Sequence, residues 1–299
     1  MVMRMINAGL VLEGGGMKGM YTAGVLEYFM ERDIYFKNCY GVSAGACHLC
    51  SYISKQKKRA YRVSLDYLSD RNYCSVQSLV LTGDLFNVQM CYDTIPNKLD
   101  LYDYKAAAKY EGNAYAVVTN IRTGEPEYMP MREMHRDIVA VQASASLPLV
   151  ARNVRIGNEY YLDGGISDAI PIRKSGADGN EKSVVVLTKE EGYVRKPTSA
   201  ASLNMIKLRY GRRFPKVYEL MKNRAERYNE TMRFLEQERQ AGRAFVICPK
   251  EANDIGRIEK DREKLEALYK IGYNDAKACF EELMRFLEKG VPQGGTVCE

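Results

Sequence analysis

The stretch NAGLVLEGGGMKG at residues 7–19 decides the fold that we expect for this chain. Its first seven residues form a short apolar run typical of a buried strand, and the three glycines that follow indicate a tight turn. Residues 19–32 then show the helical spacing of small and apolar side chains. Residues 38–42 are predicted to form a second strand that ends at Ser43, and residues 44–54 a second helix. The chain therefore begins as strand, turn, helix, strand, turn and helix.

Four further strands are predicted at residues 114–119, 160–162, 183–188 and 243–248, with helical stretches between most of them. Such alternation favours an α/β fold with a mostly parallel central sheet and helices on both faces. Ligand sites in sheets of this kind lie at the carboxyl ends of the strands. We therefore look for chemistry where the predicted strands end.

The last third of the chain is predicted to be mostly helical. Residues 203–240 are helical in pattern, with interruptions at Gly211 and Pro215, and residues 258–289 are helical again. No Pro-rich or Ser-rich linker separates these helices from the rest.

We expect a catalytic domain at residues 1–250 and a helical extension at residues 251–299 packed on the same domain. The final stretch, residues 291–299, is expected to be a frayed tail. No apolar run is long enough to cross a bilayer, and residues 1–7 have neither the basic nor the apolar region of a signal peptide. The expected location is cytoplasmic, with possible peripheral contact at the inner membrane face.

Composition excludes several classes of protein. Hydrophobic residues make up 46% and charged residues 27%, which is typical of a globular chain and unlike disordered or fibrous ones. A net charge of +6 favours anionic surfaces but is too small to define a nucleic-acid binder. The eight cysteines, Cys298 among them, are expected to be free thiols. Cys47 and Cys50 lack the second pair of a metal site, so we expect neither metal nor cofactor.

Residues 41–45, GVSAG, fit the GxSxG pattern and lie where a predicted strand passes into a predicted helix. This is the context of a nucleophile elbow, in which a strained turn presents a serine hydroxyl. Gly41 and Gly45 allow the backbone and the helix to approach closely. The alternative is that Ser43 is only a helix N-cap, a position that serine favours.

The sequence of residues 14–19, GGGMKG, also fits GxGxxG, so a dinucleotide-binding turn is one alternative. Such a turn needs an acidic residue at the end of the second strand. The nearest one, Asp33, precedes that strand. The position of the acid therefore argues against a nucleotide.

Together with Ser43, the same glycines predict a different role, because a helix start presents unpaired N–H groups. These groups are suited to an oxyanion hole, which stabilises a tetrahedral intermediate. The candidate residues are Gly14, Gly15, Gly16, Met17, Lys18 and Gly19. The Lys18 side chain either adds positive charge to the site or is a solvated surface lysine.

The base is identified largely by elimination. The chain has two histidines, His48 and His135, and both precede the best candidate acid. The Ser, Asp, His order of α/β-hydrolases requires a histidine after the acid. A histidine base is therefore not expected.

Asp163 is the best candidate base. With Gly164 and Gly165 it follows the strand predicted at residues 160–162, at the sheet edge where Ser43 is also expected. A solvated aspartate is a weak base, so the site must raise its pKa by desolvation or rely on oxyanion donors. The alternative for Asp-Gly is an ordinary turn. With the serine motif present, a Ser-Asp dyad is the simplest hypothesis.

Three motifs in this order, EGGGMKG at 13–19, GVSAG at 41–45 and DGG at 163–165, resemble the patatin-like phospholipase family and its bacterial serine acyl hydrolases. The block at residues 142–171 is also similar to the family, and the resemblance covers residues 6–190.

The resemblance implies a three-layer sandwich, with Ser43 as nucleophile and Asp163 as base. Gly15 and Gly16, with neighbouring amides, would form the oxyanion hole, and the substrates would be lipid acyl esters. Two residues depart from the family pattern: Glu13 stands where aspartate is frequent, and Lys18 where arginine is frequent. Lysine gives one charge without the planar fork of arginine, which puts headgroup preference in doubt.

The predicted function is thus a lipid acyl-ester hydrolase of the phospholipase A or lysophospholipase type. Two alternatives remain, a catalytically silent lipid-binding protein and a dinucleotide-binding oxidoreductase. Basic stretches at residues 55–62 and 207–216 are either contacts with an anionic membrane or solvated helix faces. The expected partner is a lipid or acyl-ester substrate, and no nucleic acid is expected.

Overall fold

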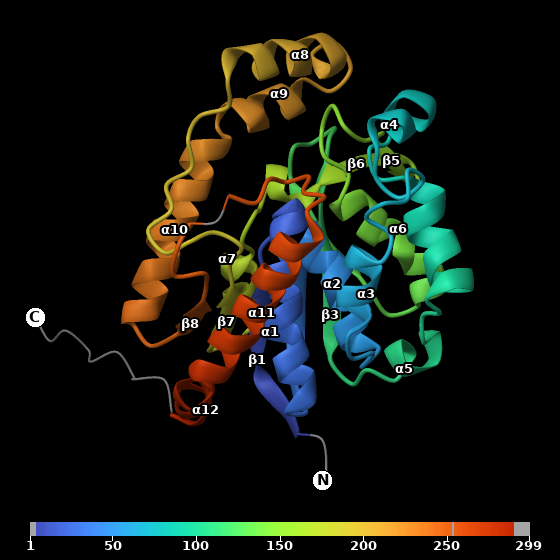
Figure 1. Cartoon of the computed structure of the whole chain (residues 1–299). Coiled ribbons are helices and arrows are strands. Elements are labelled where there is room, and N and C mark those ends of the chain that lie inside the picture. The colour runs from blue at the N-terminus through green and yellow to red at the C-terminus, as the bar shows by residue number, and fades with distance from the viewer. Residues whose placement is uncertain (1–3, 253, 290–299) are drawn as a thin grey trace, which may run out of the picture.

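In the computed structural model, which describes residues 4–252 and 254–289, eight strands form one sheet. They are arranged in the order β5-β6-β3-β2-β1-β7-β8, and β4 pairs with β3 outside this path (Figure 1). The strands are β1 Arg4–Leu12, β2 Ile34–Val42, β3 Asn113–Asn120, β4 Pro126–Pro130, β5 Val154–Ile156, β6 Glu159–Asp163, β7 Ser183–Val186 and β8 Ala244–Ile247.

The centre of the sheet is parallel, as the sequence predicts. Strands β3, β2, β1, β7 and β8 pair in parallel, whereas β4 and β6 pair antiparallel with β3, and β5 pairs antiparallel with β6. The sequence analysis did not predict the short strands β4 and β5. Both belong to the antiparallel side of the sheet, where a few residues suffice for a hairpin-like pairing.

Helices cover both faces of the sheet. Residues Leu10 and Leu12 of β1 point into the core beneath one set of helices, while Val11 between them points into the core on the opposite face. This alternation gives three layers. The first face carries α1 Met20–Glu31, α2 Ala44–Ile53, α6 Met134–Ser144 and α11 Arg262–Ala278, and the second carries α7 Ile172–Ala177 and α10 Arg224–Gln240.

Shorter helices complete the chain and lie mostly at the ends of the sandwich (Figure 1). They are η1 Gly16–Gly19, α3 Arg59–Leu65, α4 Val76–Thr82, η2 Met90–Leu99, α5 Tyr104–Ala108, η3 Gly164–Ile166, α8 Ala200–Tyr210, α9 Pro215–Lys222 and α12 Phe280–Glu288. No helix among the described residues is both long enough and apolar enough to span a membrane.

Helix α11 packs directly on α1, although the two are far apart in the sequence (Figure 1). A Cβ atom added at Gly24 of α1 would lie 2.0 Å from the carbonyl oxygen of Tyr269, and one added at Gly272 of α11 would lie 2.1 Å from that of Tyr21. These separations are far below van der Waals contact. The two glycines therefore allow the helix backbones to touch.

Most predicted elements match the structure within a few residues. The helical stretch at 203–240 is broken near Gly211 and Pro215 as predicted, and again at Asn223 between α9 and α10. The helices between residues 59 and 108 were not predicted individually. The expected tail at 291–299, with Cys298, and residues 1–3 lie outside the described residues, and the division at residue 250 stays a prediction.

Candidate active site

Ser43 is the single residue between the end of β2 and the start of α2, and its backbone has a conformation that serine rarely adopts. Its φ is +55° and its ψ is −121°, and the side chain makes no capping hydrogen bond. The N-cap alternative therefore has no support in the geometry. The conformation is instead that of a strained strand-to-helix turn.

Neighbouring residues hold this turn in place. The N–H of Ser43 donates to Ser144 Oγ at 2.9 Å, and that hydroxyl donates to the carbonyl oxygen of Val117 at 2.6 Å. Cβ atoms added at Gly41 and Gly45 would lie 2.6 Å from the Cα of Ala46 and from the carbonyl oxygen of Leu12, respectively. The turn can therefore form only with very small residues at these two positions.

The glycine loop after β1 lies directly beside Ser43. Leu12 pairs with Gly41 in the sheet, so both strands end at the same level. A Cβ atom added at Gly14 would lie 2.7 Å from the Cβ of Ser43. Gly16 has a φ of +58°, which favours glycine. The loop thus wraps closely around the serine.

The amides of this loop differ in their availability. The N–H of Met17 donates to the carbonyl oxygen of Arg257 at 3.1 Å, and that of Lys18 donates to Gly15 at 3.3 Å. For the N–H groups of Gly15 and Gly16 the structure gives no acceptor within residues 4–252 and 254–289. Gly19 packs against the side chains of Ala44 and His48.

Glu13, which precedes the loop, is a buried anchor with 1% of its surface exposed. Its carboxylate accepts hydrogen bonds from the N–H of Thr188 at 2.7 Å and from the hydroxyl of Tyr228 at 2.8 Å. Arg195 lies 4.0 Å away. Glu13 thereby ties the glycine loop to the segment after β7 and to α10.

Asp163 lies at the end of an antiparallel strand, not of a parallel one as the sequence analysis expected for the sheet. Strand β6 is antiparallel to β3, and Asp163 pairs with Val118, the residue after the Val117 that pairs with Val42. A Cβ atom added at Gly164 would lie 2.2 Å from the Val117 carbonyl oxygen. The acid and the serine therefore lie near each other, separated by the one strand β3.

The Asp163 carboxyl is buried, with 1% of the residue exposed. Its Oδ1 accepts the N–H of Gly165 at 2.7 Å, while Oδ2 makes no standard hydrogen bond within the described part of the chain. Burial raises the pKa of Asp163, and the Ser43 side chain and then the Arg224 guanidinium lower it. The contact with Ser43 is thus close enough to act on the pKa, but looser than a standard hydrogen bond.

Neither histidine makes a hydrogen bond to Ser43 among the described residues. His48 is buried on α2, where burial lowers its pKa to about 4, so its ring is neutral. His135 is exposed and stacks on Tyr104 with ring centroids 3.6 Å apart. No group of three or more His, Cys, Asp or Glu side chains among the described residues is arranged to hold a metal ion.

A cavity of about 430 Å³ is lined by Ser43 and by largely apolar side chains. They come from α1, α2, α6 and the segment between residues 59 and 104, and they include Met20, Cys47, Leu85, Phe86 and Val141. The volume and the apolar lining are those of a small-molecule site. The residues from 59 to 104 carry no motif, which is why the sequence analysis missed them.

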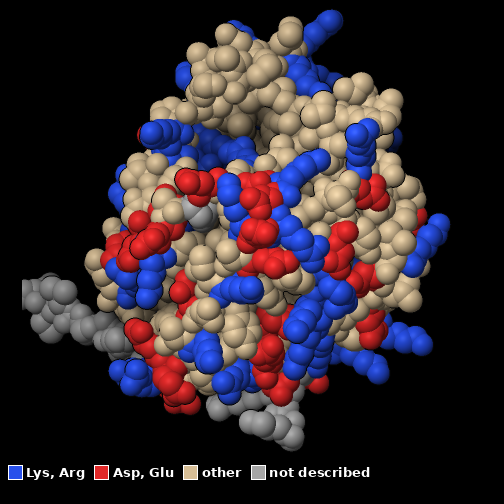
Figure 2. All heavy atoms as spheres, in the orientation of Figure 1, with Lys and Arg blue, Asp and Glu red and all other residues tan. Residues whose placement is uncertain are grey.

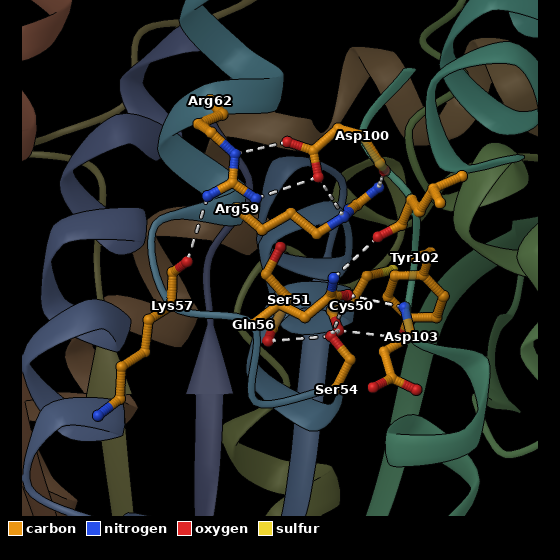
Figure 3. Close-up of polar contacts among 11 residues, drawn as sticks. Cys50, Ser51, Ser54, Gln56, Lys57, Arg59, Arg62, Asp100, Tyr102 and Asp103 are labelled. Atoms are coloured by element: carbon orange, nitrogen blue, oxygen red, sulfur yellow. Dashed lines mark hydrogen bonds and ion pairs between the residues drawn. The ribbon is translucent and has the colours of Figure 1, made fainter. Parts of the chain in front are cut away.

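Part of the cavity wall is fixed by a polar network, drawn in Figure 3. Arg59 and Arg62 both pair with Asp100, at 3.3 and 2.6 Å, and the hydroxyl of Tyr102 donates to the carbonyl oxygen of Cys50 at 3.0 Å. Two charges of the basic stretch at 55–62 are therefore paired within the chain.

Comparison with known proteins identifies the family. Residues 10–174 match the model of the Patatin-like phospholipase family, which is more than half of the chain. The chain belongs to the patatin-like phospholipase family. A second model, described as Domain of unknown function (DUF6363), matches residues 214–288.

Two individual proteins are similar to this chain. The Uncharacterized protein YjjU of Escherichia coli (strain K12) is 32% identical over 184 residues, which are 60% of this chain and 51% of that protein. The chain thus spans about half the length of this curated relative. The crystal structure of VipD from Legionella pneumophila matches 94% of this chain and 66% of that chain, with a TM-score of 0.48 and 16% identity.

The match to the family model covers the GVSAG motif at residues 41–45 and the DGG motif at residues 163–165. The α/β sandwich predicted from the sequence is confirmed. Two residues at the cavity had no sequence signal, Arg224 and Arg257. Both lie beyond residues 10–174, in the segment of unknown function.

Proposed function

We propose that this member of the family hydrolyses lipid acyl esters of the phospholipase A or lysophospholipase type with a Ser43–Asp163 dyad. The observation that carries the proposal is the strained Ser43 beside a buried aspartate whose second carboxyl oxygen has no standard hydrogen bond. A carboxyl in this state accepts a proton more readily than a solvated one, because burial raises its pKa.

In the proposed reaction Asp163 takes the hydroxyl proton of Ser43 as Oγ bonds to the ester carbonyl carbon. The carbonyl oxygen then carries the negative charge, and the amides of Gly15 and Gly16, which have no acceptor among the described residues, would donate to it. Each such donor lowers the activation free energy by about 3 kcal/mol. The alcohol leaves with the proton from Asp163, and a water activated by the same carboxylate releases the fatty acid.

The two alternatives from the sequence have less support. A dinucleotide site needs an acid at the end of β2, where Ser43 stands, and space at Gly16, where the carbonyl of Arg257 lies close. A silent lipid-binding protein would have no need of a strained serine next to a buried carboxyl. It is the outcome that remains if no covalent chemistry is found.

Covalent labelling tests the proposal. A fluorophosphonate probe is expected to modify wild-type protein at Ser43, as located by mass spectrometry of the digested protein. Ser43→Ala is expected to lose the label. Ser51→Ala is the control, since Ser51 lines the same cavity but lies eight residues further along the chain. No labelling of folded wild-type protein, or equal labelling of Ser43→Ala, would reject Ser43 as nucleophile.

Peripheral contact with an anionic membrane is a second part of the proposal, and of the two basic stretches we favour the one at residues 207–216, which begins in α8. Leu208 is 89% exposed, and Lys207, Arg209 and Met205 are exposed beside it. Apolar side chains flanked by cations favour the surface of an anionic bilayer. Wild-type protein should sediment with anionic but not neutral vesicles, and Leu208→Glu should reduce that fraction several-fold. Equal sedimentation with both vesicle types would contradict the proposal.

A further inference from the structure

Two arginines of the segment matched as a domain of unknown function lie at the cavity that contains Ser43. Arg224 is the first residue of α10, and its Nε donates to the carbonyl oxygen of Gly165 at 3.0 Å. Arg257 lies between β8 and α11. Its carbonyl oxygen accepts the N–H of Met17 and lies against Gly16. One arginine thus contacts the loop of the acid, and the other the glycine loop.

Neither arginine has a carboxylate within ion-pair distance in residues 4–252 and 254–289. By contrast, the nearby Arg195 lies 4.0 Å from Glu13. Beyond its bond to Gly165, the Arg224 guanidinium makes no other hydrogen bond in this part of the chain. Donors and positive charge therefore remain available at the cavity.

Positive charge is concentrated around Arg224. Burial and, after it, the charges of Arg195 and Arg257 lower the pKa of Arg224 to about 9. Burial likewise lowers the pKa of Lys189 to about 8. Figure 2 shows Lys and Arg side chains beside the hollow that lies below α8 and α9. Cations held together in this way are stabilised by a bound anion.

We infer that Arg224 and Arg257 form a subsite for the phosphate group of the ester substrate, beside Ser43. Guanidinium groups bind phosphate through paired charge-assisted hydrogen bonds. The inference deepens the proposed function and depends on it, since it names the residues that would hold the phosphate of a phospholipase substrate. It also gives the segment of unknown function a role in substrate recognition.

A competing role for the same arginines is to act on Asp163, because both lower the pKa of that carboxyl. The two roles predict different results. Loss of a phosphate subsite weakens the binding only of ligands that carry a phosphate. Loss of charge near Asp163 changes the turnover of neutral and anionic esters alike.

Binding of ether lipids, which cannot be hydrolysed, separates recognition from catalysis. The probes are an alkylglycerol phosphate and the alkylglycerol with the same chain, titrated calorimetrically into wild type, Arg224→Gln and Arg257→Gln. Wild-type protein is expected to bind the phosphate ether about tenfold or more tightly than the neutral one. Each substitution should weaken binding of the phosphate ether by about tenfold and change the affinity for the neutral ether by no more than about twofold.

Controls keep the result interpretable. Arg285→Gln removes an exposed arginine of α12 that does not line the cavity, and it should change neither affinity. Arg224→Lys keeps a charge and should retain part of the preference. Competition by inorganic phosphate distinguishes a site for free phosphate, which displaces the ether at low concentration, from one that requires the lipid. Equal affinities of wild-type protein for both ethers, or equal losses for both in the variants, would overturn the subsite.

Hydrolysis of the matching acyl compounds separates this inference from the proposed function. Phosphate-selective binding without any turnover would reject the ester hydrolase and leave the subsite in place. Turnover that falls equally for the neutral and the phosphorylated ester in Arg224→Gln and Arg257→Gln would reject the subsite and leave the hydrolase.

Discussion

Asp163→Asn is expected to lower the kcat for ester hydrolysis by about 10²- to 10⁴-fold, the usual contribution of a general base. Asparagine has the same shape and can keep the hydrogen bond that Oδ1 accepts from Gly165. It cannot take the proton of Ser43, because its amide is not basic. The measurement is steady-state hydrolysis of a p-nitrophenyl ester, with folding checked by circular dichroism.

The same substitution should leave the fold as stable as the wild type or more so at neutral pH. Burial raises the pKa of Asp163 above its ordinary value of 3.8, so the ionised carboxylate opposes folding. The stabilisation of the fold by the neutral form of Asp163 is fully present below the pKa that this carboxyl has in the unfolded chain. It is lost as pH rises through the raised pKa of the folded protein. Asparagine avoids this loss. Lower activity together with undiminished stability identifies a catalytic group rather than a structural one.

The pH dependence of activity is a further test of Asp163 as the base. Wild-type activity should increase as pH rises through the raised pKa of Asp163, because only the ionised carboxylate acts as base. Asp168→Asn is a matched control: its carboxyl also has a pKa raised by burial, but it accepts the hydroxyl of Tyr128, and Ser43 does not act on its pKa. Full activity in Asp163→Asn, or equal losses in both variants, would contradict the dyad.

Gly272→Ala is expected to destabilise the protein by about 2–3 kcal/mol through overpacking. The added Cβ would lie 2.1 Å from the carbonyl oxygen of Tyr21, and that backbone belongs to the fully packed helix α1. Helix propensity alone predicts the opposite sign, since alanine is favoured over glycine within a helix by about 1 kcal/mol. The sign of the change therefore decides between local propensity and tertiary packing.

Urea unfolding of Gly272→Ala and Gly176→Ala measures this difference. Gly176 lies within α7, and a Cβ atom there would have no neighbour within 4 Å. Gly176→Ala should therefore be neutral or stabilising by up to about 1 kcal/mol. If Gly272→Ala proved as stable as the wild type, the close contact between α1 and α11 would be wrong.

The sequence was most informative where chemistry and local geometry coincide. Ser43 and the glycines around it were found because a strained turn needs specific small residues at fixed spacing. The sheet was predicted from apolar runs, but the antiparallel direction of β6 was not, since a strand of five residues has the same pattern in either direction. The dyad and the oxyanion donors stay predictions until they are tested.

The cavity was hidden from the sequence for a different reason. Its walls between residues 59 and 104, and Arg224 and Arg257, come together only through contacts between distant segments. An arginine at the start of a helix looks like any solvated arginine until the packing around it is known. The cavity is therefore formed by packing between distant segments, which the local sequence pattern does not predict.

The pairing of β8 with β7 bears on how this protein can evolve. Strand β8 belongs to residues 214–288, yet it extends the sheet built by residues 10–174, and α11 of the same segment covers α1. Loss of that segment would leave β7 as an open strand edge and uncover an apolar helix, both of which promote aggregation. Substitutions on the packing faces of β8 and α11 are therefore expected to lower the solubility of the whole protein.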